Sequence, residues 1–181
     1  MFAKFNLSDI SGVSQVKSSQ ARGIRTKILE QFPSLEAPLE ELMPKRLPLK
    51  LAKCKARVTL VLGGEGQILF IQERDGPFFP HLRLLHQYPD ILPHFRVDKG
   101  AIKRVLSGAP IMCPGLTSAN AAMVDVPADT PVAIMAEGKQ HALAIGLTVM
   151  STEEIRTINK DVGVNNVLYL NDGVWKTSKC E

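Results

Sequence analysis

The 181-residue sequence has no long apolar run and no hydrophobic leader. No stretch reaches the roughly 18 apolar residues that a membrane-spanning helix needs. Residues 1–19 carry polar and charged side chains where a secretory signal has its apolar core. We therefore expect a cytoplasmic protein that does not engage a membrane.

Cysteine is scarce and irregularly spaced. The three thiols, Cys54, Cys113 and Cys180, are odd in number, and no two of them form a C-x-x-C pair. Structural zinc sites usually draw their ligands from such pairs. We therefore expect no metal site, and thiols that stay reduced in the cytosol.

Motifs of common catalytic and cofactor-binding sites are also missing. The sequence has no G-x-x-x-x-G-K-[ST] loop, no G-x-G-x-x-G after a strand and no H-E-x-x-H motif. Cys113 and His141, with Asp125 or Asp129, supply the residue types of a Cys/His nucleophile pair, but no local signature accompanies them. We therefore expect no enzyme and no cofactor.

The residues that are present suit a globular chain with unevenly placed charge. Hydrophobic residues make up 45% and charged residues 22%, which is enough for a buried core. The formal net charge of +4 comes from residues 1–92, which hold 13 Lys and Arg against 9 Asp and Glu. Residues 93–181 hold 9 of each.

Six of these cations lie together, and no acidic residue occurs between Leu42 and Gly64. They are Lys45, Arg46, Lys50, Lys53, Lys55 and Arg57. Such a cluster attracts phosphates and favours nucleic-acid binding. A solvated basic face is the alternative.

Local patterns predict an α/β first part. An apolar residue at every fourth position predicts a helix over 19–32. Ser34 is expected to cap a second helix. Strand-like runs at 57–62 and 67–73 flank a glycine-rich turn and predict a hairpin. Prolines bracket the end of this part, so we place the domain boundary between 1–92 and 93–181.

The second part shows closely spaced short strands with two small helices, typical of a barrel-like α+β domain. Asp98 is expected to cap one helix and Gly108 to end it in a left-handed conformation. Ser151 begins a capping box for the other helix, which is predicted to end at Gly163. Trp175 is expected to close the barrel core. Strands are predicted at 110–113, 124–126, 130–136, 142–149, 167–170 and 174–176.

The segment around Gly108 is the strongest binding candidate. A glycine at a helix end lets backbone approach a ligand, and the helix before it carries Lys99, Lys103 and Arg104. Backbone contacts and nearby cations are a common way of reading single-stranded RNA. The alternative is an ordinary helix cap with surface lysines. Lys139 and His141, after Gly138, are either further RNA contacts or simply a polar turn.

Four runs resemble the malignant T-cell-amplified sequence family. Residues 99–118, Lys-Gly-Ala-Ile-Lys-Arg-Val-Leu-Ser-Gly-Ala-Pro-Ile-Met-Cys-Pro-Gly-Leu-Thr-Ser, resemble the opening helix, turn and second strand of its PUA domain. Residues 133–143 and 168–175 are similar to its later strands, and residues 76–93 to its pre-PUA domain. The resemblance implies an α+β chain with an N-terminal α/β pre-PUA domain and a C-terminal PUA β-barrel-like domain.

The resemblance also implies a role in translation. Family members pair with density-regulated protein, which has an SUI1-type domain, and act on the small ribosomal subunit in reinitiation, non-canonical initiation and tRNA release during recycling. By this resemblance the PUA domain binds the tRNA acceptor end, and the pre-PUA domain helps to dock on the ribosome and the partner. From its charge, the basic cluster is predicted to contact small-subunit RNA. The carried-over RNA-end residues are Lys103, Arg104, Gly108, Ala109, Met112, Cys113 and Pro114. An accessory role in RNA modification or ribosome biogenesis is the alternative. His81 stands where animal members are expected to have a hydroxyl residue.

Overall fold

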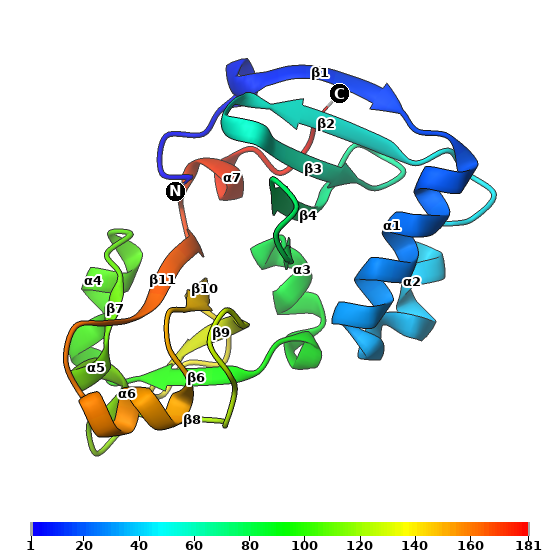
Figure 1. Ribbon diagram of the computed structural model, residues 1–181. Helices are drawn as coiled ribbons and strands as arrows, with labels where there is room; N and C mark the ends of the chain where they lie inside the picture. Colours follow the sequence, from blue (N-terminus) through cyan, green and yellow to red (C-terminus); the bar gives the residue numbers. More distant parts are fainter. Residues whose placement is uncertain (1, 181) are drawn as a thin grey trace.

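A computed structural model describes residues 2–180, which form two β-sheet lobes (Figure 1). The first sheet is antiparallel throughout, with strand order β1-β2-β3-β4-β5. Its strands are β1 (Ile10–Gln15), β2 (Lys50–Cys54), β3 (Val58–Leu62), β4 (Ile68–Glu73) and β5 (Phe78–Pro80). The helices of this lobe are α1 (Ser18–Gln31), α2 (Glu36–Leu42) and α3 (Leu82–Gln87).

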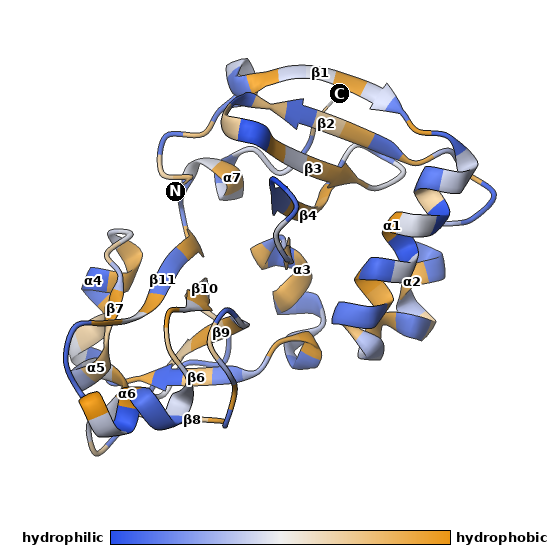
Figure 2. Ribbon diagram, viewed as in Figure 1, coloured by the Kyte–Doolittle hydropathy of each residue, from blue (hydrophilic) through white to orange (hydrophobic). Residues whose placement is uncertain are grey.

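The predicted first helix and hairpin of the first lobe are confirmed, whereas one predicted helix cap is wrong. Hydrophilic and hydrophobic bands alternate along α1 (Figure 2), and its apolar stripe leads to Ile28 and Phe32 in the core. The Phe32 ring stacks on Phe70 of β4 at 5.8 Å between centroids. Strands β3 and β4 form the predicted hairpin. The expected Ser34 cap is wrong, because Ser34 lies inside the 3-10 helix Pro33–Leu35 that leads into α2.

The second sheet is curled and has strand order β7-β11-β10-β9-β6-β8, with β6 parallel to β9. Its strands are β6 (His94–Val97), β7 (Ile111–Met112), β8 (Ala122–Met123), β9 (Pro131–Ala136), β10 (Ala144–Thr148) and β11 (Val162–Tyr169). The helices here are α4 (Ile102–Leu106), α5 (Cys113–Thr117) and α6 (Thr152–Ile158). This lobe has its own core, centred on Phe95, Ile134 and Ile155.

Helix α6 shows both a confirmed and a wrong prediction. Ser151 accepts from Glu154 N and Glu154 accepts from Ser151 N, so the capping box is present. The helix ends at Asn159, which is left-handed with φ +47°, rather than at Gly163. Gly163 instead lies in β11, where a Cβ would be 3.2 Å from Cys113 Sγ.

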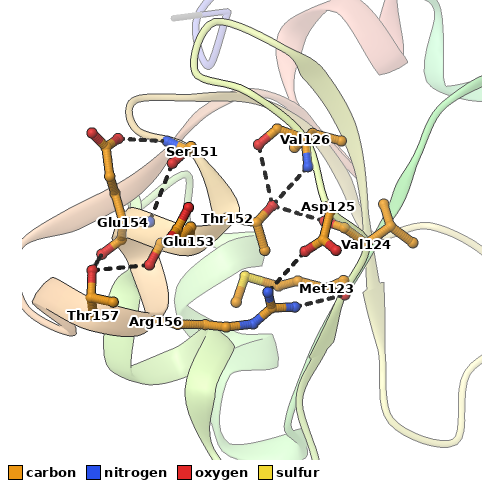
Figure 3. Close-up of polar contacts among 10 residues, drawn as sticks. All are labelled: Met123, Val124, Asp125, Val126, Ser151, Thr152, Glu153, Glu154, Arg156 and Thr157. Carbon is orange, nitrogen blue, oxygen red and sulfur yellow. Dashed lines mark hydrogen bonds and ion pairs between the residues drawn. The ribbon is translucent and has the colours of Figure 1, made fainter.

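A side chain of α6 explains why the strand predicted at 124–126 is not a strand. The buried Thr152 hydroxyl donates to Val124 O at 2.8 Å and accepts from Val126 N at 3.0 Å, as Figure 3 shows. Arg156 pairs with Asp125 at 2.8 Å. The segment therefore pairs with helix side chains, and the strand β8 precedes it.

The chain end returns to the first lobe. The predicted strand at 174–176 is instead the short helix α7 (Gly173–Lys176), capped by Asp172. Beyond it, Ser178 O accepts from Ile68 N at 3.1 Å, and Cys180 N donates to Gly66 O at 2.7 Å. The tail, which the sequence analysis assigned to the second domain, therefore packs on the first sheet.

Trp175 consequently lies at the junction of the two lobes, so the prediction that it closes the barrel core is wrong. The Arg83 guanidinium of α3 lies 3.9 Å from the centre of its ring. His86 meets the same ring at 5.6 Å between centroids and donates through Nε2 to Ala142 O at 2.8 Å. Helix α3 thus connects the first lobe with both α7 and the start of β10.

Candidate RNA-binding surface

The helical turn that carries the candidate residues begins as predicted. Asp98 caps the 3-10 helix Lys99–Ala101, which runs into α4, by accepting from Ala101 N at 3.1 Å. Its other carboxylate oxygen accepts from the Ser118 hydroxyl at 3.0 Å. Of the apolar residues of α4, only Val105 is fully buried, while Ile102 and Leu106 are half-buried. The helix therefore lies on the surface of the second lobe.

Gly108 ends α4 in the left-handed conformation that the sequence predicts, with φ +86°. A second requirement comes from β11, because a Cβ at Gly108 would lie 2.9 Å from Cε1 of Tyr169. Because of the backbone angle and the close tyrosine, any side chain at position 108 would be energetically costly. The turn thus holds bare backbone at the surface next to a tyrosine ring.

Asn166 of β11 holds this turn through two hydrogen bonds, and sequence patterns did not predict its role. Its amide Nδ2 donates to Val105 O at 3.0 Å and to Ala109 O at 3.2 Å. Those two carbonyls lie at the end of α4 and just beyond Gly108. No local sequence pattern could have identified Asn166, because it lies 61 residues from Val105 along the chain.

Three exposed cations lie on the helical segment that leads to the turn. Lys99, Lys103 and Arg104 are exposed, and among residues 2–180 no acidic side chain forms an ion pair with them. Lys99 reaches the β9–β10 hairpin, since a Cβ at Gly138 would lie 3.7 Å from Lys99 Cε. Exposed Lys139 follows at the same hairpin tip. The start of the α4 helical segment and the β9–β10 hairpin, which were predicted separately as binding candidates, therefore lie side by side and carry Lys99 and Lys139.

The candidate residues just after Gly108 differ in their exposure to solvent. Met112 is 43% exposed, Pro114 is exposed and Ala109 is half-buried. Cys113 is fully buried, with Sγ 3.8 Å from Met150 Sδ, and burial raises the pKa of its thiol. The Cys113 side chain is therefore a core group at the start of α5, and an RNA contact by this residue stays a prediction.

His141 lies at the other end of its loop from Lys139. Its ring is 5.1 Å from the ring of His86, which belongs to α3 of the first lobe. The structure therefore brings Lys139 to the α4 surface and places His141 at the lobe junction. An RNA contact by His141 stays a prediction.

The basic cluster is spread along β2 and the segments on either side of it. Lys50 and Lys53 are exposed on β2, while Lys45 and Arg46 lie in the loop before it, beside α1. Lys55 lies beyond the other end of β2 and pairs with Asp9 at 3.4 Å. The positive-φ residue Arg57 follows it. Neighbours in sequence are thus spread along the full length of a strand.

None of the helices within 2–180 is both long and apolar enough to cross a membrane. The same part of the chain contains no group of three or more His, Cys, Asp or Glu residues placed to hold a metal ion.

Comparisons with known proteins agree with this fold. A Pre-PUA-like domain model matches residues 5–89, and a PUA domain model matches residues 93–170. The chain is therefore an RNA-binding protein of the PUA class, with a pre-PUA domain before the PUA domain.

Relatives define the family. "Malignant T-cell-amplified sequence 1-A" of Xenopus laevis is 52% identical over 176 residues, 97% of each chain. The Dictyostelium discoideum homologue is 51% identical over 183 residues, which spans both chains fully. The chain belongs to the malignant T-cell-amplified sequence family. In fold it is similar to a hypothetical protein of Pyrococcus horikoshii OT3, with TM-score 0.72 and 21% identity over 92% of this chain and 99% of the other.

Proposed function

We propose that this protein is a non-catalytic cytoplasmic translation factor that binds the acceptor end of tRNA on the small ribosomal subunit. Its partner is a homologue of density-regulated protein, an SUI1-domain protein. The pair acts in reinitiation, non-canonical initiation and tRNA release during recycling. Membership in the malignant T-cell-amplified sequence family supports this role.

One observation carries the tRNA contact. The Gly108–Ala109 turn presents bare backbone that Asn166 and Tyr169 hold in place. The amides of Gly108 and Ala109 donate to Val105 O and Arg104 O, which leaves the Gly108 carbonyl without a hydrogen bond to the described residues. This carbonyl can pair with a splayed base of a single-stranded end, as is common in RNA recognition. The exposed cations Lys103 and Arg104 on the helix before the turn offset phosphate charge.

The substitution Ala109→Asp tests this contact by adding bulk and negative charge where the RNA end must lie. It should strongly reduce tRNA retention on purified small subunits, while leaving the melting temperature and partner pull-down nearly unchanged. Lys103→Ala should weaken retention more mildly, because one phosphate contact is one of several.

Ala128→Asp is a matched control. Ala128 is half-buried like Ala109 and precedes β9, whereas the Lys139 hairpin follows that strand. Normal tRNA retention by folded Ala109→Asp, or equal loss with Ala128→Asp, would contradict the proposed site. A low melting temperature confined to Ala109→Asp would make Ala109 a packing residue. The Lys103→Ala variant would then decide whether tRNA binds at this surface, because unchanged tRNA retention in that variant would contradict the site.

A further inference from the structure

An open pocket of about 560 Å³ lies in the first lobe, away from the PUA surface. One wall is the first half of α1, and the other is the loop that leads from α2 to β2 and passes alongside it (Figure 1). Side chains from both walls line it, including Ser18, Arg22, Arg25, Lys45, Arg46 and Pro48. The pocket thus lies between two segments of the pre-PUA domain, 15–25 and 45–49, that are separate in sequence.

The charge of this pocket is of one sign. Four lining residues are cations and none is acidic. Within residues 2–180, neither Arg22, Lys45 nor Arg46 forms an ion pair with a carboxylate. The nearest acid contact is Glu40, whose carboxylate accepts from the backbone N of Lys45 at 3.1 Å. The side chains of Arg22, Lys45 and Arg46 are therefore free for a ligand, whereas Arg25 donates to Pro44 O through Nη2.

Both ends of the loop are fixed, so the pocket has a defined shape. Arg25 Nη2 donates to Pro44 O at 3.0 Å, which ties the start of the loop to α1. Val16 N donates to Leu49 O at 3.0 Å and holds the loop's other end beside the entry to α1. Arg22 and Arg46 consequently face a common space from two anchored walls, a preorganised arrangement that lowers the entropic cost of binding.

The chemistry of the lining indicates a phosphate ligand. Guanidinium groups bind phosphate oxygens in a bidentate manner, and the positive end of the α1 dipole at Ser18 adds to their field. None of the lining residues is aromatic, so no ring is available for a base to stack on. Contacts limited to phosphate and sugar bind RNA without regard to its sequence.

We propose that the pocket between α1 and the 45–49 loop is a second RNA site that holds backbone phosphates of a folded RNA. The site deepens the proposed function, because ribosomal RNA is the ligand which that function would bring to it. It also regroups the basic cluster: Lys45 and Arg46 act with Arg22 and Arg25, which lie outside the run of cations seen in sequence.

The test uses the full chain with the double substitution Arg22→Glu and Arg46→Glu. Both side chains are exposed, so the fold should keep its melting temperature. Binding to a short fluorescein-labelled RNA hairpin, read by anisotropy, should weaken at least about tenfold near physiological salt, and the slope of log K against log salt should become shallower by about 2. Lys27→Glu on the same helix is the control, since Lys27 is exposed and does not line the pocket.

Competitors distinguish the sources of the anion. Inorganic phosphate and polyglutamate at matched ionic strength should displace the hairpin poorly, whereas an unlabelled hairpin of unrelated sequence should displace it fully. Displacement by phosphate or by polyglutamate as effective as by RNA overturns the proposal, in favour of a free-phosphate site or an acidic protein partner. Equal affinities of the double variant and Lys27→Glu also overturn it.

A comparison of hairpins with and without a single-stranded acceptor end distinguishes this proposal from the acceptor-end contact. The Arg22→Glu/Arg46→Glu protein should still discriminate a hairpin ending in a single-stranded acceptor sequence from a blunt one, because the Ala109 surface is intact. Ala109→Asp should lose that discrimination and keep the salt-dependent binding of the blunt hairpin. If Ala109→Asp alone lacks an effect, the acceptor-end contact fails while the phosphate site stands.

Discussion

Acidification should destabilise the lobe junction through His81. This residue is only 2% exposed and caps α3, where Nδ1 accepts from Arg83 N at 3.1 Å. The other ring nitrogen, Nε2, donates to Val174 O of α7 at 3.2 Å. Both nitrogens are thus used by the neutral ring, and a second proton would displace the cap acceptor and place a charge in the core.

The size of the effect follows from the pKa. Burial, helped by nearby Arg83 and His86, lowers the pKa of His81 from 6.5 to about 4. A histidine with a depressed folded-state pKa contributes stability that is present above the unfolded-state pKa and is lost as the pH falls toward the folded-state value. Linkage then gives a loss of about 2 kcal/mol in the free energy of unfolding between about pH 7 and pH 5.

The assay is thermal or denaturant unfolding across that pH range. For a chain of this size, the loss corresponds to a fall of about 4–8 °C in melting temperature. His81→Asn keeps a side-chain acceptor at the cap and removes the titrating ring, so it should lose most of the pH dependence. His86, whose pKa is also lowered by burial, should account for part of what remains.

His141→Asn is the control, because His141 is an exposed histidine of the same junction. It should retain the His81 part of the pH dependence, while the loss of the ring 5.1 Å from His86 can alter only the smaller His86 part. Equal pH dependence in His81→Asn and the unmodified protein would refute the argument. That result would mean that His81 is protonated in the folded state without cost.

Two further predictions concern the Gly108 turn and the thiols. Gly108→Ala should destabilise the protein by about 1–3 kcal/mol, because φ is +86° and Tyr169 leaves no room for a Cβ; urea unfolding measures this, and an unchanged midpoint would contradict the geometry. Replacing Cys54, Cys113 and Cys180 with serine should leave RNA binding intact and cost about 1–3 kcal/mol for each of the two buried positions, Cys113 and Cys180. Stoichiometric zinc in the purified protein, measured by atomic emission, would show that the thiols have a role this prediction denies.

Sequence patterns predicted the elements that short-range interactions control. The α1 stripe, the β3–β4 hairpin and the Ser151 capping box each depend on residues a few positions apart. The left-handed Gly108 is of the same kind, because its backbone angle is a local property. The resemblance to a known family added the order of the two domains, which the family models match.

Local patterns failed where a distant segment competes for the same groups. The predicted strand at 124–126 gives its backbone hydrogen bonds to Thr152, and the predicted strand at 174–176 is a helix capped by Asp172. Cys113 looks like part of an exposed strand in sequence and is buried against Met150. For 124–126 and for Cys113 the partner lies too far along the chain for a local pattern to include it, whereas the Asp172 cap of α7 lies only three residues from Trp175 and is a local signal that the strand prediction overlooked.

By itself, the sequence determined that this chain has a helix ending in bare backbone, cations near that end and a run of six more cations. Only the tertiary structure decided which of these charges act together. It brought Lys99 to the Gly138 hairpin, split the basic run along β2 and joined Lys45 and Arg46 to Arg22 of α1. The physical reason is that electrostatic attraction depends on distance in space, and folding sets that distance independently of spacing along the chain.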